Sequence, residues 1–108
     1  MIWCTYSYFN KELPQHIGKA TNITKSSCYI QYSEGQLYAK HAWDKDYVKM
    51  FESLEGAICY MYTNSDMKYL SEIKQDLSYS FVEDAKTVNW DTVLRPLKIK
   101  KMLKMMTF

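Results

Sequence analysis

Apolar residues in this chain occur in runs of only a few residues, separated by polar or turn-forming positions. A helix that crosses a membrane needs about 20 consecutive apolar residues, so the sequence predicts no membrane span. The chain has 108 residues, a length that fits one domain with a single core. Its first residues, MIWCTYSYFNKE, lack the basic start and long aliphatic middle of a signal peptide. We therefore expect a cytoplasmic protein.

The first 63 residues contain four segments that are typical of strands and two with helical features. Strands are predicted at 2–9, 27–32, 36–43 and 57–63, and helices at 11–20 and 44–56. Pro14 and Gly18 weaken the first helix, whereas Gly35 suits a tight hairpin between the second and third strands. The order strand, helix, strand, strand, helix, strand is that of the ferredoxin-like split βαβ pattern.

The helix predicted at 44–56 has signals at both ends. Asp44 is a good N-cap and Gly56 suits a left-handed C-cap, while Trp43 could pack on Val48 as a hydrophobic staple. Apolar residues recur at helical spacing between the two caps: Tyr47, Val48, Phe51 and Leu54.

More helical material is expected after residue 64. A helix is predicted from Ser65 or Asp66 to about Leu77, and 78–86 could continue it or form an edge strand. Asn89 is predicted to cap a last short helix that Pro96 stops. The predicted fold is thus a single small α+β domain over 1–94, with an antiparallel sheet, helices on one face and a C-terminal helical extension.

Tyrosine is the most unusual component, with 10 copies in the chain. Tyr6 and Tyr8 are two positions apart, and so are Tyr60 and Tyr62. Since side chains alternate between the faces of a strand, each pair is expected to share one face. Such rings could stack on bases, form a protein interface, or pack under helices with their hydroxyl groups at the surface.

The charge is distributed unevenly along the chain. Residues 1–94 hold 9 lysines and 12 acidic residues, a net charge of −3, whereas 95–108 carry +5 and no acid. The tail predicts a basic amphipathic segment, either a helix or an edge strand whose lysines discourage aggregation, packed on the same domain. Its candidate contacts for a partner are Lys98, Lys100, Lys101 and Lys104.

No pattern in the sequence predicts a catalytic group, a metal site or a cofactor site. The three cysteines, Cys4, Cys28 and Cys59, form no close pair and are expected to be buried free thiols. His16 and His41 have no partner at metal-ligand spacing, and the three glycines are isolated, which excludes a phosphate-binding loop. The enzyme hypothesis that stays open is a nuclease-like one, in which His41 would act with Tyr38 or Lys40.

These observations favour a small non-catalytic interaction protein that binds a protein partner. The expected contacts are Tyr6, Tyr8, Tyr60, Tyr62 and the four tail lysines. The excess of lysine over arginine suggests an AT-rich gene, which fits a phage or mobile element encoding an inhibitor of a host factor. The alternative is a single-stranded nucleic-acid-binding module that uses the same tyrosines and lysines. A homodimer is also an option for so small a domain.

Overall fold

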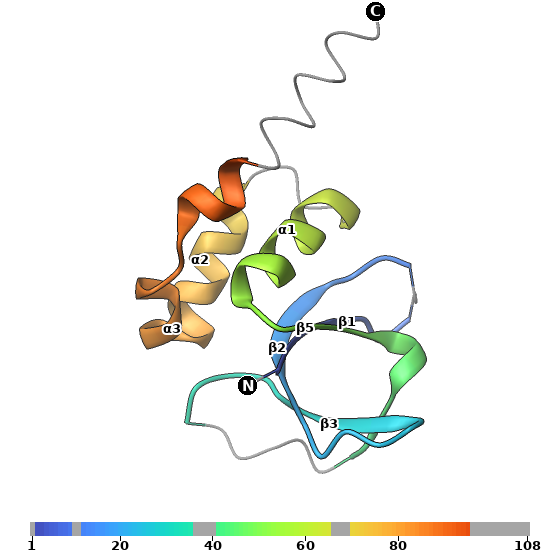
Figure 1. The fold of residues 1–108 in the computed structure, drawn as a ribbon. Coiled ribbons are helices and arrows are strands. Elements are labelled where there is room, and N and C mark those ends of the chain that lie inside the picture. Colours follow the sequence, from blue (N-terminus) through green and yellow to red (C-terminus); the bar gives the residue numbers. More distant parts are fainter. Residues whose placement is uncertain (1, 10–11, 36–40, 66–69, 96–108) are drawn as a thin grey trace, which may run out of the picture.

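A five-stranded antiparallel sheet comes first in the chain and the main helices follow it (Figure 1). The computed structural model describes residues 2–9, 12–35, 41–65 and 70–95. The strands are β1 Ile2–Tyr6, β2 His16–Thr21, β3 Ser27–Gln31, β4 Trp43–Asp44 and β5 Val48–Phe51. The helices are α1 Leu54–Asn64, α2 Leu70–Ser80 and α3 Val82–Lys86, with a 3-10 turn η1 at Lys45–Tyr47 and a further helix at 90–95.

The sheet curls because its two edge strands are consecutive in the chain. Its order is β4-β3-β2-β1-β5, so β4 and β5 lie at opposite ends, yet only η1 separates them. A 3-10 turn of three residues spans about 6 Å, so the two edges must approach each other at this corner. Backbone bonds hold the corner: Ser7 N donates to Tyr47 O at 3.2 Å, and Lys45 N donates to Ser26 O at 3.1 Å.

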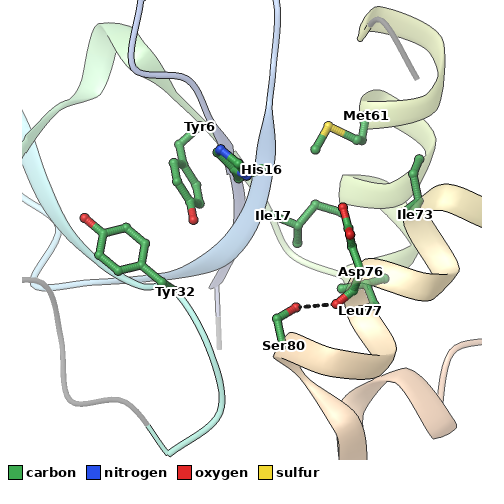
Figure 2. A pocket seen from close by; sticks show the side chains of 9 residues that line it. All are labelled: Tyr6, His16, Ile17, Tyr32, Met61, Ile73, Asp76, Leu77 and Ser80. Atoms are coloured by element: carbon green, nitrogen blue, oxygen red, sulfur yellow. Dashed lines mark hydrogen bonds between the residues drawn. The ribbon is translucent and has the colours of Figure 1, made fainter.

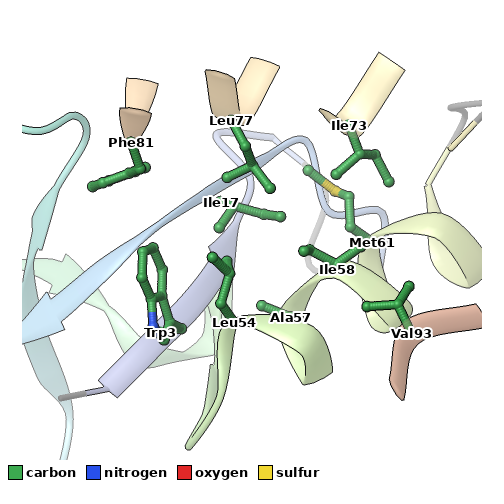
Figure 3. Close-up of a cluster of buried hydrophobic side chains, with 10 residues drawn as sticks. All are labelled: Trp3, Ile17, Leu54, Ala57, Ile58, Met61, Ile73, Leu77, Phe81 and Val93. Carbon is green, nitrogen blue, oxygen red and sulfur yellow. The ribbon is translucent and has the colours of Figure 1, made fainter. Parts of the chain in front are cut away.

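Alternation along β1 divides the buried side chains into two clusters. Trp3 belongs to the helix-side cluster, between the sheet and the helices (Figure 3). Cys4 and Tyr6 belong to a second cluster on the opposite face of β1, which we call the inner cluster. The buried members of the helix-side cluster are Trp3, Ile17, Leu54, Ala57, Ile58, Met61, Ile73, Leu77, Phe81 and Val93. The inner cluster contains Cys4, Tyr6, Ala20, Cys28 and Ile30.

The helix predicted at 11–20 is wrong, because β2 occupies its second half. β2 pairs with β1 through Cys4↔Gly18 and with β3 through Lys19↔Gln31. Gly18 suits this central position, since a Cβ there would lie 2.8 Å from Gln31 O. A glycine that weakens a helix is here the residue that lets two strands pack closely.

The helix predicted at 44–56 is also wrong. Asp44 does cap, but it caps only η1, where its Oδ1 accepts from Asp46 N at 2.9 Å. The apolar residues at helical spacing include Val48 and Phe51. In the structure these are the first and last residues of β5, and they pair with Tyr6 and Trp3 of β1. Pairing with a central strand outweighs the helical spacing, because β1 would otherwise lose its hydrogen-bonded neighbour on that side.

The strand predicted at 57–63 lies within α1, which is a third error. Ser53 is the N-cap of α1, and its Oγ accepts from Gly56 N at 3.1 Å. Gly56 therefore lies in the first turn of a helix rather than after the last turn. The buried residues of α1, Leu54, Ala57, Ile58 and Met61, recur at helical spacing and face the sheet.

Other predictions are confirmed. The domain is α+β with an antiparallel sheet and its helices on one face. Gly35 has the positive φ expected of it, 79°, while the hairpin predicted around it extends into residues outside the described ranges. Of the two alternatives for 78–86, the helix is the one found, with a break at Phe81. Asn89 caps the 90–95 helix, since its Oδ1 accepts from Thr92 N at 3.2 Å.

The ferredoxin-like order is not found, because in the described part of the chain no α-helix precedes α1. Most of the strand predicted at 36–43 and the tail from 96 onward lie outside the described residues. The prediction of a basic amphipathic segment at 95–108 is therefore untested.

Candidate functional site

Aromatic side chains from four separate places in the chain meet at one end of the curled sheet. Tyr6 ends β1 and pairs with His16 at the start of β2. The curl brings in the other side from β3 and β4, which pair through Cys28↔Trp43. We call the group the aromatic cluster; its members are Tyr6, Tyr8, Phe9, His16, Tyr32 and Trp43.

Trp43 lies in the middle of the aromatic cluster. Its ring centroid is 4.9 Å from that of Tyr8 and 5.2 Å from that of Tyr6. Its Nε1 donates a hydrogen bond of 2.8 Å to the Tyr32 hydroxyl oxygen. Ring contacts and this hydrogen bond hold the side chains in place before any ligand arrives, which lowers the entropic cost of binding.

The aromatic cluster is buried on one side and exposed on the other. Tyr6 is 5% exposed, whereas Tyr8 is 52% exposed and Phe9 is 89% exposed. Tyr8 contacts Tyr6, Trp43 and His16, so the exposed rings continue directly from the packed ones. Contiguous exposed apolar surface on a folded domain marks interaction sites more often than scattered residues do.

A pocket of about 260 Å³ lies beside the aromatic cluster, between the sheet and the helices (Figure 2). Tyr6, His16 and Tyr32 form one wall of the pocket. The other walls come from β2, α1 and α2, with the residues Ile17, Met61, Ile73, Asp76, Leu77 and Ser80. The Ser80 hydroxyl donates a hydrogen bond of 2.9 Å to the backbone oxygen of Asp76. The carboxylate of Asp76 takes no part in this bond.

Burial keeps the phenols and thiols around the aromatic cluster protonated. It is the main cause that raises the pKa of Tyr6, and it also raises the pKa of Tyr8, with Tyr32 contributing through charge and a hydrogen bond. Burial raises the pKa of the Cys4 thiol to about 12 and also raises that of Cys28. At neutral pH these side chains are therefore uncharged, and both thiols are poor nucleophiles.

One of the two predicted tyrosine pairs is found on a shared face and the other is not. Tyr6 and Tyr8 come together as expected, with centroids 6.2 Å apart. Tyr60 and Tyr62 do not share a face, because positions two apart on a helix are about 200° apart. Tyr60 contacts the Phe51 ring at 5.4 Å, and Tyr62 packs on the helix-side cluster.

The four lysines of the predicted site, Lys98, Lys100, Lys101 and Lys104, lie outside the described residues, as do Tyr38 and Lys40. His41 is described and exposed. It makes no ring contact with the aromatic cluster among the contacts that the described residues form.

Sequence reasoning missed Phe9, Tyr32, Trp43 and Asp76 as site residues. Tyr32 and Trp43 flank the hairpin predicted around Gly35, which is the signal that could have placed them near each other. Asp76 carries no such signal, because its position beside the rings depends on how α2 packs across the sheet.

The prediction of buried free cysteines is confirmed for Cys4 and Cys28, both fully buried, while Cys59 is half-buried. Within the described ranges, no group of three or more His, Cys, Asp or Glu side chains could hold a metal ion. None of the helices in this part of the chain has the length and apolar character needed to cross a membrane. Comparisons with protein-family models, with curated proteins and with solved structures found no match to this chain.

Proposed function

We propose that this chain is a non-catalytic protein-binding domain whose main contact surface is the aromatic cluster. The observation that carries the proposal is the exposure of Tyr8 and Phe9 on a base of packed rings. Aromatic residues are enriched at protein interfaces and dominate binding energy where they become fully buried. A partner that covers these two rings would gain apolar burial without first having to order the rings beneath Tyr8.

The chemistry of the surroundings supports binding rather than covalent catalysis. The thiols nearest the aromatic cluster, Cys4 and Cys28, are buried and have raised pKa values. The Tyr32 hydroxyl already accepts a hydrogen bond from Trp43. The more specific function, inhibition of a host factor by a phage or mobile-element protein, is a proposal that rests on composition alone. In that proposal the tail lysines provide a second contact.

The proposal predicts that a variant with Tyr8→Ser and Phe9→Ser loses its partner and keeps its fold. Lysate treated with nuclease is passed over the immobilised wild-type chain and variants, and retained proteins are quantified by mass spectrometry. The matched control is Tyr79→Ser, because Tyr79 is 77% exposed but lies on α2, outside the aromatic cluster. Proteins retained by wild type and by the control should fall at least about tenfold with the double variant, a loss of about 1.4 kcal/mol.

Two results would contradict the proposal. Equal retention by all three chains would show that Tyr8 and Phe9 contact no partner. Retention that disappears with nuclease treatment, and direct binding of single-stranded RNA or DNA that weakens steeply with salt, would support the nucleic-acid alternative instead. Loss of retention through self-association of the aromatic cluster is recognised separately by sedimentation of the wild-type chain, which would show a dimer.

A further inference from the structure

We propose that the pocket beside the aromatic cluster receives the guanidinium group of an arginine side chain from the partner. This inference rests on the proposed function, since it assigns a chemical class to one contact of the bound protein.

Aromatic side chains form one wall of the pocket. Tyr6 and Tyr32 have centroids 5.6 Å apart, and His16 lies 5.3 Å from Tyr6. All three line the pocket (Figure 2). Cations bind to aromatic faces at centroid distances of up to about 6 Å, and arginine does so more often than lysine. A group that enters this pocket therefore meets aromatic surface on one side.

Asp76 places a negative charge on the other side of the same pocket. Figure 2 shows its carboxylate on the side of α2 that faces the sheet. No basic side chain of the described residues forms an ion pair with Asp76; the ion pairs there join Lys19 to Asp84 and Lys86 to Glu83. The carboxylate is thus available to an incoming cation and would repel a phosphate or another acidic group.

The remaining walls select among cations. Ile17, Met61 and Leu77 are buried apolar residues that line the pocket. A guanidinium group is more weakly hydrated than an ammonium group, stacks on aromatic rings and bonds to a carboxylate through two parallel N–H groups. The volume of about 260 Å³ gives room for such a planar group between the rings and Asp76.

The test uses the full chain and Nα-acetyl-arginine methylamide as the probe, with the citrulline derivative as a neutral analogue of the same shape. Binding is followed by amide chemical shifts of His16, Ile17 and Ser80, which lie on both sides of the pocket. The arginine probe should bind at least about tenfold more tightly than the citrulline probe, a difference that corresponds to about 1.4 kcal/mol. Asp76→Asn should remove that preference, and Asp76→Glu should restore part of it.

Asp91→Asn is the matched control, because Asp91 is an exposed acid on the 90–95 helix and does not line the pocket. It should leave the preference for arginine unchanged. Equal binding of the arginine and citrulline probes would overturn the inference. Tighter binding of the lysine or trimethyl-lysine derivative would overturn the assignment to arginine. Either failure leaves the comparison of Tyr8, Phe9 and Tyr79 variants intact, so the proposed function is tested separately.

Discussion

Cys4 lies in the inner cluster and is fully shielded from solvent. Desolvation there raises its pKa from 9.0 to about 12. The unfolded chain therefore loses the thiol proton above pH 9 while the folded chain keeps it. The contribution of the protonated thiol to stability is complete below pH 9 and is lost as the pH rises toward the folded-state pKa.

We expect the free energy of unfolding to fall by about 1.4 kcal/mol per pH unit above pH 9 through this one group. Urea unfolding between pH 7 and pH 11 measures the fall. Cys28 and Tyr6 also have raised pKa values and add losses of the same sign. The Cys4→Ala variant isolates the contribution of Cys4, since its curve should converge on that of the wild type as the pH rises. Parallel curves would contradict this assignment.

At the scale of single residues, the sequence indicated burial well and contacts poorly. The burial of Cys4 and Cys28 is predicted correctly, because a thiol between aromatic residues has few other roles, whereas Cys59 is only half-buried. Gly18 was misinterpreted, because the property that weakens a helix is the same one that permits close approach of two strands. The choice between a weak helix and a close strand pair depends on the Gln31 carbonyl, and its position is known only from the tertiary structure.

At the scale of elements, α1 depends on its N-cap. Ser53 has an extended backbone, and its Oγ accepts the Gly56 amide at 3.1 Å. We expect Ser53→Ala to lower the free energy of unfolding by about 1 kcal/mol, because the amide at the start of the helix loses its partner. Thermal or urea unfolding measures this change. Ser53→Asp keeps an acceptor at the same position and should restore most of the loss, and a variant Ser53→Ala as stable as wild type would show that the cap contributes nothing.

The sequence predicted some elements and not others for a consistent reason. β1, β3 and α2 were recognised because their local preferences agree with their tertiary environment. Two segments are predicted with the wrong type of structure. The sequence predicts a helix at Val48–Phe51, which is a strand, and a strand at 57–63, which is part of a helix. In both segments the local pattern is ambiguous, and pairing with β1 and burial against the sheet decide the outcome.

At the scale of the whole molecule, Lys19 connects the sheet to the last helices. Its Nζ lies 2.9 Å from Asp84 Oδ2, and it also lies over the Trp3 and Phe81 rings at 4.9 Å and 5.4 Å. The two side chains of the pair are 15% and 31% exposed, which shields the pair from solvent and salt. The contact therefore joins β2, β1 and α3 in one place.

A double-mutant cycle with Lys19→Met and Asp84→Asn should give a coupling energy of about 1 kcal/mol, at the upper end for partly exposed pairs. The matched control is the pair Lys86–Glu83, at 3.2 Å but with side chains 65% and 72% exposed. Its coupling should stay below about 0.5 kcal/mol. Similar values for both pairs would mean that burial and the neighbouring rings add nothing to the Lys19 contact.

The topology could not be predicted from the sequence, although the fold class could. The α+β class follows from the mixture of local patterns, whereas the strand order depends on η1 bringing β4 back toward β5. The aromatic cluster depends on the same curl. Tyr6 ends β1 and Trp43 begins β4, and β2 and β3 lie between these two strands in the sheet, yet the two rings are in contact. Strand alternation predicts that Tyr8 lies beside Tyr6, and the two rings do meet although β1 ends at Tyr6. The position of Asp76 depends on the packing of α2.

The central position of β1 has a consequence for synthesis on the ribosome. β1 is made first and can pair with β2 at once, but its other neighbour, β5, ends at Phe51. Until that residue leaves the exit tunnel, the nascent chain carries an unpaired edge on β1, and Trp3 stays uncovered until the helices that pack on it and Phe81 have also emerged. Such edges are the usual starting points of aggregation. A pause in translation that holds Phe51 inside the exit tunnel would therefore prolong the exposure of this edge, whereas a pause after Phe51 has left the tunnel would find β1 paired on both sides.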